Sequence, residues 1–307
     1  MATRNYSTMI LAVRRSSFFI WLVTAAVVAL SVSACHRKEA PAAPMATPSV
    51  TVNHDKAPLG SPLEVTYKFV VSNDAHFDQD YRVMVHVVDT DDELMWTDDH
   101  NPPVPTSQWK PGQTIQYTRT VFVPVYPYVG DASMEMGLYS LQNQKRLPLA
   151  GEDIGQRAYK VAHIQLQPQT ENVFTLFKDG WHPAETAERN AQIEWQWTKK
   201  TATLVFRNPK KDCVFYLDVD NPGGVFNDTQ HVQVKLNGAL VHEFDLTPKV
   251  QVLRKIPLTE AQLGSGEMDQ IEIGVDKTFI PAAVRGSNSK DSRELGIRVF
   301  HAFVDAR

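Results

Sequence analysis

Five side chains in the C-terminal half are of the types that bind sugars. They are Trp181, His182, Glu185, Asp291 and Arg293. An indole ring offers an apolar face to the C–H groups of a pyranose. Carboxylate oxygens accept hydrogen bonds from hydroxyls, and guanidinium N–H groups donate to them. We therefore take these residues as candidates for a glycan-binding site.

A structural role is the alternative for the same region. Trp195 and Trp197 share one face of a predicted strand, where their rings could extend a sugar-binding face or fill the core. Asp291 and Arg293 are close in sequence and could pair with each other, which would fix the last loop to a sheet. Both interpretations are open at this point.

Acidic residues in the N-terminal half could contribute ligands to calcium. Asp89, Asp91 and Asp92 supply the hard oxygens that Ca²⁺ prefers, and Asp98 and Asp99 follow them. The run lacks the glycine and the terminal glutamate of an EF-hand loop, and aspartates are also common in hairpin turns without a metal. We expect a turn and no cofactor, and calcium is the alternative.

The sequence contains no recognisable catalytic constellation. Its ten histidines are dispersed, and neither a G-x-S-x-G elbow nor an H-E-x-x-H pair occurs. Cys213 and His86 each lie in an alternating segment and are expected to be structural. A pair of glycosidase carboxylates would be recognisable only after folding. We expect a protein that is not an enzyme, with a glycan hydrolase as the alternative.

The N-terminal segment has the features of an export signal. Arginines precede an apolar run over residues 18–32, which is shorter than the roughly 20 residues that span a bilayer comfortably. Small residues follow, and then Cys35. The segment Val-Ser-Ala-Cys over residues 32–35 resembles a lipobox, where lipoprotein signal peptidase cleaves before a cysteine that carries diacylglycerol. The resemblance implies a signal peptide over residues 1–34 and lipid attachment at Cys35, with palmitate among the acyl chains.

The segment after Cys35 is rich in proline and alanine and has no apolar periodicity up to residue 49. Such a composition predicts a semi-extended tether over residues 35–49. In lipoproteins, aspartate just after the cysteine favours the inner membrane, whereas this chain has His36. We expect an anchor in the cell envelope, on the periplasmic face of the outer membrane rather than the inner one. An ordinary signal peptide, or a short anchor helix with an incidental cysteine, is the alternative.

From residue 50 onward, short segments alternate between apolar and polar residues and are bounded by turn residues, a pattern typical of β-sandwiches. The predicted strands are 50–52, 63–69, 81–88, 114–123, 132–141, 193–198, 202–206, 213–219, 231–236, 240–246, 250–256, 270–275 and 296–304. Asn237-Gly238 predicts a hairpin, because both residues tolerate positive φ. We predict an all-β chain with an Ig-like sandwich over residues 50–168 and a jelly roll over residues 169–307.

Each predicted domain also resembles a known module. The ordered motifs His86-Val87-Val88-Asp89, Trp109-Lys110-Pro111-Gly112, Gly137-Leu138-Tyr139 and Arg146-Leu147-Pro148-Leu149 lie within residues 80–150. This region resembles an Ig-like module appended to bacterial membrane glycosyltransferases of the protein-mannosyltransferase-like class. That module brings no activity with it, so the resemblance implies a fold and a setting only.

The second resemblance covers residues 178–305. It depends on Gly180-Trp181-His182-Pro183-Ala184-Glu185, Leu236-Asn237-Gly238, Phe279-Ile280-Pro281 and Asp291-Ser292-Arg293-Glu294-Leu295-Gly296. The region is similar to a carbohydrate-binding-like jelly-roll domain found beside bacterial surface-polysaccharide enzymes. The similarity implies glycan binding by the C-terminal domain.

Composition limits the partners. The chain of 307 residues has 43% hydrophobic and 21% charged residues and a formal net charge of −4. Its lysines and arginines are scattered, which excludes the basic stripe of a nucleic-acid surface. We expect an envelope lipoprotein that binds polysaccharide or assists surface-polysaccharide assembly, with a membrane contact through Cys35. A lipoprotein that docks envelope proteins without binding glycan is the alternative.

Overall fold

The structure is a computed structural model that describes residues 42–125, 128–169, 173–188, 190–221, 223–226 and 228–306. The predicted signal peptide, Cys35 and the start of the predicted tether lie outside the described residues. Within the described part of the chain, no helix is long and apolar enough to cross a membrane. Most of the regular structure is strand, so the prediction of an all-β sandwich fold is confirmed.

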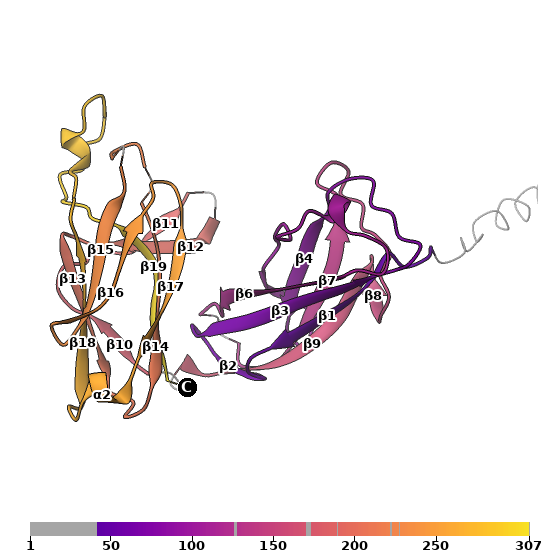
Figure 1. The fold of residues 1–307 in the computed structure, drawn as a ribbon, viewed down its shortest axis with the longest axis horizontal. Coiled ribbons are helices and arrows are strands. Elements are labelled where there is room, and N and C mark those ends of the chain that lie inside the picture. Colours follow the sequence, from indigo (N-terminus) through magenta and orange to yellow (C-terminus); the bar gives the residue numbers. More distant parts are fainter. Residues whose placement is uncertain are drawn as a thin grey trace, which may run out of the picture. The chain divides into compact units, whose positions relative to one another are not determined.

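The first sandwich is made of two sheets (Figure 1). One has the order β1 (Ala46–Val52), β3 (Pro62–Val71) and β6 (Thr114–Phe122). The other has the order β2 (Lys56–Pro58), β9 (Ala158–Gln167), β7 (Gly130–Tyr139), β4 (Arg82–Val88) and β5 (Leu94–Thr97), with β8 (Asp153–Gly155) paired to β9. The pairing of β2 with β9 is parallel and the others are antiparallel. The first segment of the chain thus enters both sheets, and the order is that of an Ig-like sandwich.

Alternate residues of these strands form the core of the first sandwich. In β3, Val65, Tyr67 and Phe69 are fully buried, whereas Lys68 between them is exposed. Trp109 follows a 3-10 turn, η1 (Thr106–Gln108), and its ring packs 5.0 Å from that of Phe69. The Trp-x-Pro-Gly motif therefore anchors the loop before β6 to the core.

The structure corrects the end of the predicted tether. Residues 46–49 belong to β1, where Ala46 and Pro48 are buried and pair with Val71 and Phe69 of β3. The small and imino residues hide the alternation in the sequence, and a proline is tolerated because β1 is an edge strand. The first domain therefore begins at or before Ala46.

The second sandwich consists of two five-stranded antiparallel sheets, in the arrangement of a jelly roll (Figure 1). One sheet has the order β10 (Thr175–Phe177), β13 (Thr201–Arg207), β18 (Met268–Val275), β15 (Gln230–Leu236) and β16 (Ala239–Leu246). The other has the order β11 (Glu185–Ala187), β12 (Asn190–Trp197), β19 (Arg298–Ala306), β14 (Cys213–Asp220) and β17 (Val252–Leu258). The short helices are α2 (Glu260–Leu263) and the 3-10 turn η3 (Pro281–Ala283).

The core of the second sandwich confirms the predicted alternation. Cys213, Phe215, Leu217 and Val219 of β14 are all buried and belong to one hydrophobic cluster. Burial raises the pKa of the Cys213 thiol to about 11, so this cysteine is a small apolar residue of the core. The predicted hairpin is also present, because Asn237 and the following glycine have φ of 50° and 86° between β15 and β16.

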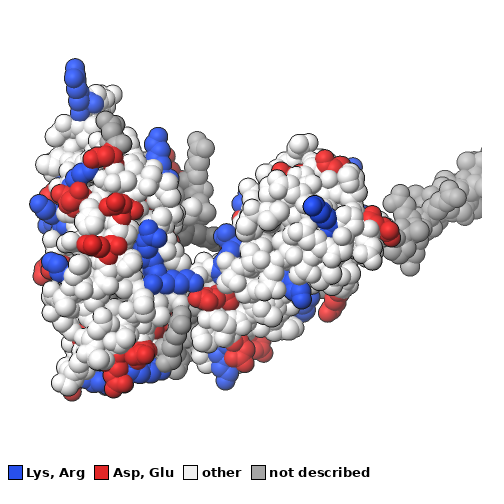
Figure 2. Space-filling view, in the orientation of Figure 1, with Lys and Arg blue, Asp and Glu red and all other residues white. Residues whose placement is uncertain are grey.

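Charged residues of both signs are interspersed on the visible face of each sandwich (Figure 2). This distribution agrees with the small net charge of −4. It gives no support to a nucleic-acid surface, which needs a continuous basic area.

Candidate functional site

The outer face of the sheet containing β12 and β19 carries aromatic and charged side chains. In β19, Val299 belongs to the core, so its neighbours Arg298 and Phe300 point away from the core. In β14, Asp220 lies directly opposite Arg298 in the strand pairing. Opposed residues of antiparallel strands share a face, so Asp220 also points outward.

The same face extends across β12 to the edge strand β11. Trp195 of β12 packs with its ring 6.1 Å from that of Phe300, and it lies directly opposite Glu185 of β11. We call this set the outer-face row. It consists of Glu185, Trp195, Phe300, Arg298 and Asp220.

Arg298 is the central residue of the outer-face row. Its Nε and Nη2 donate to the two carboxylate oxygens of Asp220 at 2.7 and 2.5 Å. Its guanidinium carbon lies 4.9 Å from the ring centroid of Trp195 and 5.4 Å from that of Phe300. The planar ion pair and the two cation–π contacts hold these side chains in one arrangement.

Trp195 differs from the tryptophans that serve the core. The indole N–H of Trp181 donates to the Thr203 carbonyl at 2.7 Å, and that of Trp109 donates to the Val104 carbonyl at 2.9 Å. The indole nitrogen of Trp195 is buried and has no hydrogen-bond partner among the described residues. An unpaired buried donor costs about 1–3 kcal/mol, so folding alone is a poor explanation for a tryptophan at this position.

An ion-pair cluster adjoins the outer-face row at Glu185. Arg293 Nη2 donates to Glu185 Oε1 and to Asp291 Oδ2, at 2.7 Å in each case. Arg293 Nε donates to both oxygens of Asp291 at 3.0 and 3.1 Å. The hydrogen bonds from Arg293 lower the pKa of Asp291 to about 2, and the two carboxylates raise the pKa of Arg293. Asp291 and Arg293 are therefore both charged at neutral pH.

The structure brings together three of the five residues predicted from the sequence. Glu185, Asp291 and Arg293 form the cluster just described, and their side chains are 33%, 27% and 35% exposed. Trp181 instead packs against the core with its N–H bonded to β13. His182 is buried, and its Nε2 donates to the Glu294 carbonyl at 2.7 Å. These contacts hold both side chains at the edge of the sandwich, and their assignment to a sugar-binding face stays a prediction.

The interpretation of Asp291 and Arg293 as a structural pair is also correct in part. Arg293 joins its loop to β11 through Glu185. The loop is fixed further on, where the Gly296 N–H donates to the Thr198 carbonyl at 2.6 Å. The same ion pairs therefore fix the loop and place polar groups beside Trp195.

Trp197 is almost completely buried although it shares the outer face. It is 7% exposed, and its ring packs 5.6 Å from that of Phe279. The loop that contains Phe279 covers this end of the sheet, where Phe226 packs 5.9 Å from Phe279. Trp195 is the more accessible of the two residues.

The acidic run in the first sandwich forms a turn. Asp89 Oδ1 accepts hydrogen bonds from the N–H groups of Asp91 and Glu93, at 2.9 Å in each case. Among the described residues, no three His, Cys, Asp or Glu side chains converge in a way that could hold a metal ion. Asp92 adopts a φ of 60°, as expected in a tight turn. The geometry fits the predicted turn.

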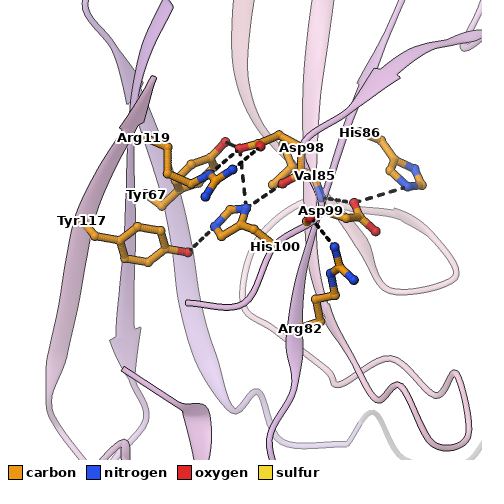
Figure 3. A network of polar contacts seen from close by, with 9 residues as sticks. All are labelled: Tyr67, Arg82, Val85, His86, Asp98, Asp99, His100, Tyr117 and Arg119. Atoms are coloured by element: carbon orange, nitrogen blue, oxygen red, sulfur yellow. Dashed lines mark hydrogen bonds and ion pairs between the residues drawn. The ribbon is translucent and has the colours of Figure 1, made fainter. Parts of the chain in front are cut away.

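A second polar cluster lies inside the first sandwich (Figure 3). Asp98 accepts from the Tyr67 hydroxyl at 2.9 Å and from Nε and Nη2 of Arg119 at 2.9 and 2.8 Å. His100 Nδ1 donates to the Asp98 carbonyl at 2.6 Å, and its Nε2 lies 2.7 Å from the Tyr117 hydroxyl. Burial lowers the pKa of His100 and raises those of Tyr67 and Tyr117, so the histidine and both phenols are neutral at neutral pH.

This cluster joins the two sheets of the first sandwich. Tyr67 and Arg119 belong to β3 and β6, whereas Asp98 directly follows β5 of the other sheet. The next residue, Asp99, accepts from the Val85 N–H at 2.9 Å, and its carboxylate lies 4.0 Å from His86 (Figure 3). Apart from the bond between His100 and the Asp98 carbonyl, the hydrogen bonds named here join separate segments of the sandwich, so we assign the cluster to folding.

Comparisons with known proteins give no family. No family model matches the chain, and no curated protein matches it. Among solved structures, the carbohydrate-binding module CBM36 in complex with calcium and xylotriose is 11% identical, with 43% of this chain and 98% of that chain covered and a TM-score of 0.25. The tandem CBM22 domains of Xyn10C from Paenibacillus barcinonensis are 10% identical, with 84% and 82% covered and a TM-score of 0.29.

A catalytic protein is also among the matches. A family GH115 4-O-methyl-α-glucuronidase is 16% identical, with 44% of this chain covered and a TM-score of 0.31. This chain spans only 18% of that enzyme. Carbohydrate-binding modules thus occur among the structural matches, but at these scores the likeness carries no argument about function.

Proposed function

We propose that this chain is an envelope lipoprotein, anchored through Cys35, whose second sandwich binds glycan without catalysis. The binding site is the outer-face row together with Arg293 and Asp291. The observation that carries the proposal is Trp195, an indole held on the outer face between charged groups although its buried N–H has no partner in the described structure. We place the anchor in the outer membrane, facing the periplasm.

The side chains of the site have the chemistry that sugars require. Trp195 and Phe300 provide apolar surface for pyranose C–H groups. Next to them, the Asp220–Arg298 and Glu185–Arg293 pairs offer both acceptors and donors to hydroxyls. Glu185 lies directly opposite Trp195, so these groups adjoin the ring across a single strand pairing.

The charges of the site support binding rather than hydrolysis. A glycosidase needs one carboxylic acid with a raised pKa to protonate the leaving oxygen. Here Arg293 pairs with both Glu185 and Asp291 and lowers the pKa of Asp291 to about 2, while Asp220 accepts two bonds from Arg298. Asp291 is thereby stabilised in its ionised form and is a poor general acid.

Trp195→Ala tests the proposal. The full chain, purified in a sugar-free detergent, is screened on a glycan array, and the oligosaccharides it retains are titrated by calorimetry. We expect the variant to bind at least tenfold more weakly, which corresponds to about 1.4 kcal/mol, because the apolar platform for the ring is lost. Phe174→Ala is the control, since Phe174 is an exposed aromatic residue outside the outer-face row.

Two results would contradict the proposal. One is the absence of binding to any glycan at millimolar concentration; the other is equal affinity in the wild type and in Trp195→Ala. Recovery of a single stable protein partner without glycan would then favour a docking lipoprotein.

A further inference from the structure

We infer that the outer-face row and its adjoining cluster select neutral glycans and discriminate against glycans that carry carboxylates. The inference rests on the proposed function, because it names the chemical class of ligand for the same site. It follows from how the charges of the site are paired.

Both cations of the site already have anionic partners. Arg298 uses Nε and Nη2 on the two oxygens of Asp220. Arg293 uses Nε on Asp291, and its Nη2 bonds to Asp291 and Glu185. An incoming carboxylate therefore meets guanidinium groups whose charge is already balanced by carboxylates, so it gains less from the contact that arginine makes with uronic acids or other anions.

The carboxylates of the site outnumber its guanidinium groups. Asp220, Asp291 and Glu185 are negative, and Arg293 and Arg298 are positive, so one negative charge is in excess. Arg298 and Asp220 have side chains only 22% and 10% exposed, so water screens this pair poorly. An acidic sugar would lose its hydration beside a net negative site, which makes its binding unfavourable.

The hydroxyl groups of a neutral sugar are complementary to the paired charges of the site. Each of its hydroxyls both donates and accepts, and a paired carboxylate and guanidinium group together supply an acceptor and further N–H donors. Arg298 Nη1 has no hydrogen bond within its pair with Asp220, and the guanidinium group lies over the Trp195 ring. A pyranose packed beside that ring can exchange hydrogen bonds with the pair without leaving a charge unpaired.

The test compares matched probes on the full chain in a sugar-free detergent. The neutral probes are the hexamers of glucose, mannose and xylose in β-1,4 linkage, and the acidic probes are the hexamers of galacturonate and mannuronate. We expect at least one neutral hexamer to bind at least about tenfold more tightly than either uronate. Its affinity should change less than about twofold between about 50 and about 500 mM NaCl, because no net charge is brought together.

A double substitution that frees a cation provides the second measurement. Glu185→Gln with Asp291→Asn keeps the shapes of both side chains and removes the negative charges that pair with Arg293. We expect the uronate hexamers to gain at least about tenfold in affinity in this variant. The matched control is Glu243→Gln with Asp245→Asn, which removes the same charge from the His231 cluster on β15 and β16. Thermal melting of each variant checks that it is folded.

The outcomes separate the two proposals. Uronate binding by the wild type that equals or exceeds neutral binding and is lost in Trp195→Ala would overturn the charge selection and leave glycan binding intact. Equal gains in the two double variants would also overturn it, because the effect would then be one of net charge alone. If no probe of either class binds, and the array retains nothing, both proposals fail.

Discussion

At the scale of single residues, two glycines allow the second sandwich to hold its loops close to its strands. A Cβ at Gly296 would lie 2.4 Å from the Thr198 hydroxyl oxygen and 2.6 Å from the Lys199 carbonyl. A Cβ at Gly180 would lie 1.9 Å from the Thr201 carbonyl, and its φ is +83°. Both positions belong to the motifs that resemble the jelly-roll family, so part of that signature is explained by packing rather than by ligand binding.

Gly180→Ala should therefore destabilise the second sandwich strongly. Left-handed backbone and steric overlap with β13 together should cost on the order of 3 kcal/mol. Gly238→Ala is the matched control, because Gly238 also has positive φ, at +86°, but nothing lies within 4 Å of its Cβ position. The control should lose only about 1 kcal/mol. Urea unfolding measures both, and equal losses in the two variants would contradict the role given to close packing.

At the scale of elements, strands with unbroken alternation could be predicted from the sequence. One long strand whose alternation is interrupted, β9, could not. The long strand β9 escaped prediction because a bulge opposite Met134 and Glu135 lets Val161 and Ala162 interrupt the period of two. The strands β2, β8, β10 and β11 have three residues each, too few to show a period.

Only part of the candidate site could be predicted from the sequence. Asp291 and Arg293 are near neighbours in the sequence, so their pairing could be anticipated. Arg298 and Asp220 lie on β19 and β14 and meet only through the strand pairing. The available signal was a charged residue next to Val299 within a predicted apolar strand, which implies a partner on the neighbouring strand.

The polar cluster that joins the sheets of the first sandwich should make its stability depend on pH. An unfolded histidine has a pKa of about 6.5, and burial lowers the pKa of His100 in the folded state. Between these values the unfolded chain binds more protons, so the free energy of unfolding decreases as the pH falls below about 6.5. Asp98 and Asp99 oppose the shift and Arg119 adds to it, but burial is the largest cause.

His100→Gln should reduce this pH dependence. Urea unfolding of the first sandwich is compared at about pH 7.5 and about pH 5.5, on either side of the ordinary histidine pKa. The wild type should lose stability at the lower pH, and the variant should lose less, although it is less stable at both values. His54→Gln is the control because His54 is exposed. An unchanged pH dependence in His100→Gln would show that other groups cause the loss.

At the scale of the whole molecule, the proposed lipid anchor makes the sharpest prediction. If the Cys35 thiol carries the lipid, Cys35→Ser should prevent modification and processing, because a hydroxyl is not the nucleophile that the lipid transferase uses. Two acyl chains give stable membrane attachment, at about 0.8 kcal/mol for each buried methylene group. Metabolic labelling with an alkyne fatty acid should therefore tag the wild type and leave Cys35→Ser untagged, and the variant should run as a larger precursor.

Cys213→Ala is the matched control, since Cys35 and Cys213 are the two cysteines of the chain and Cys213 is buried in the core. Equal labelling of the wild type and Cys35→Ser, or a mature N-terminus at another residue by mass spectrometry, would exclude a lipoprotein and indicate secretion or an uncleaved anchor helix.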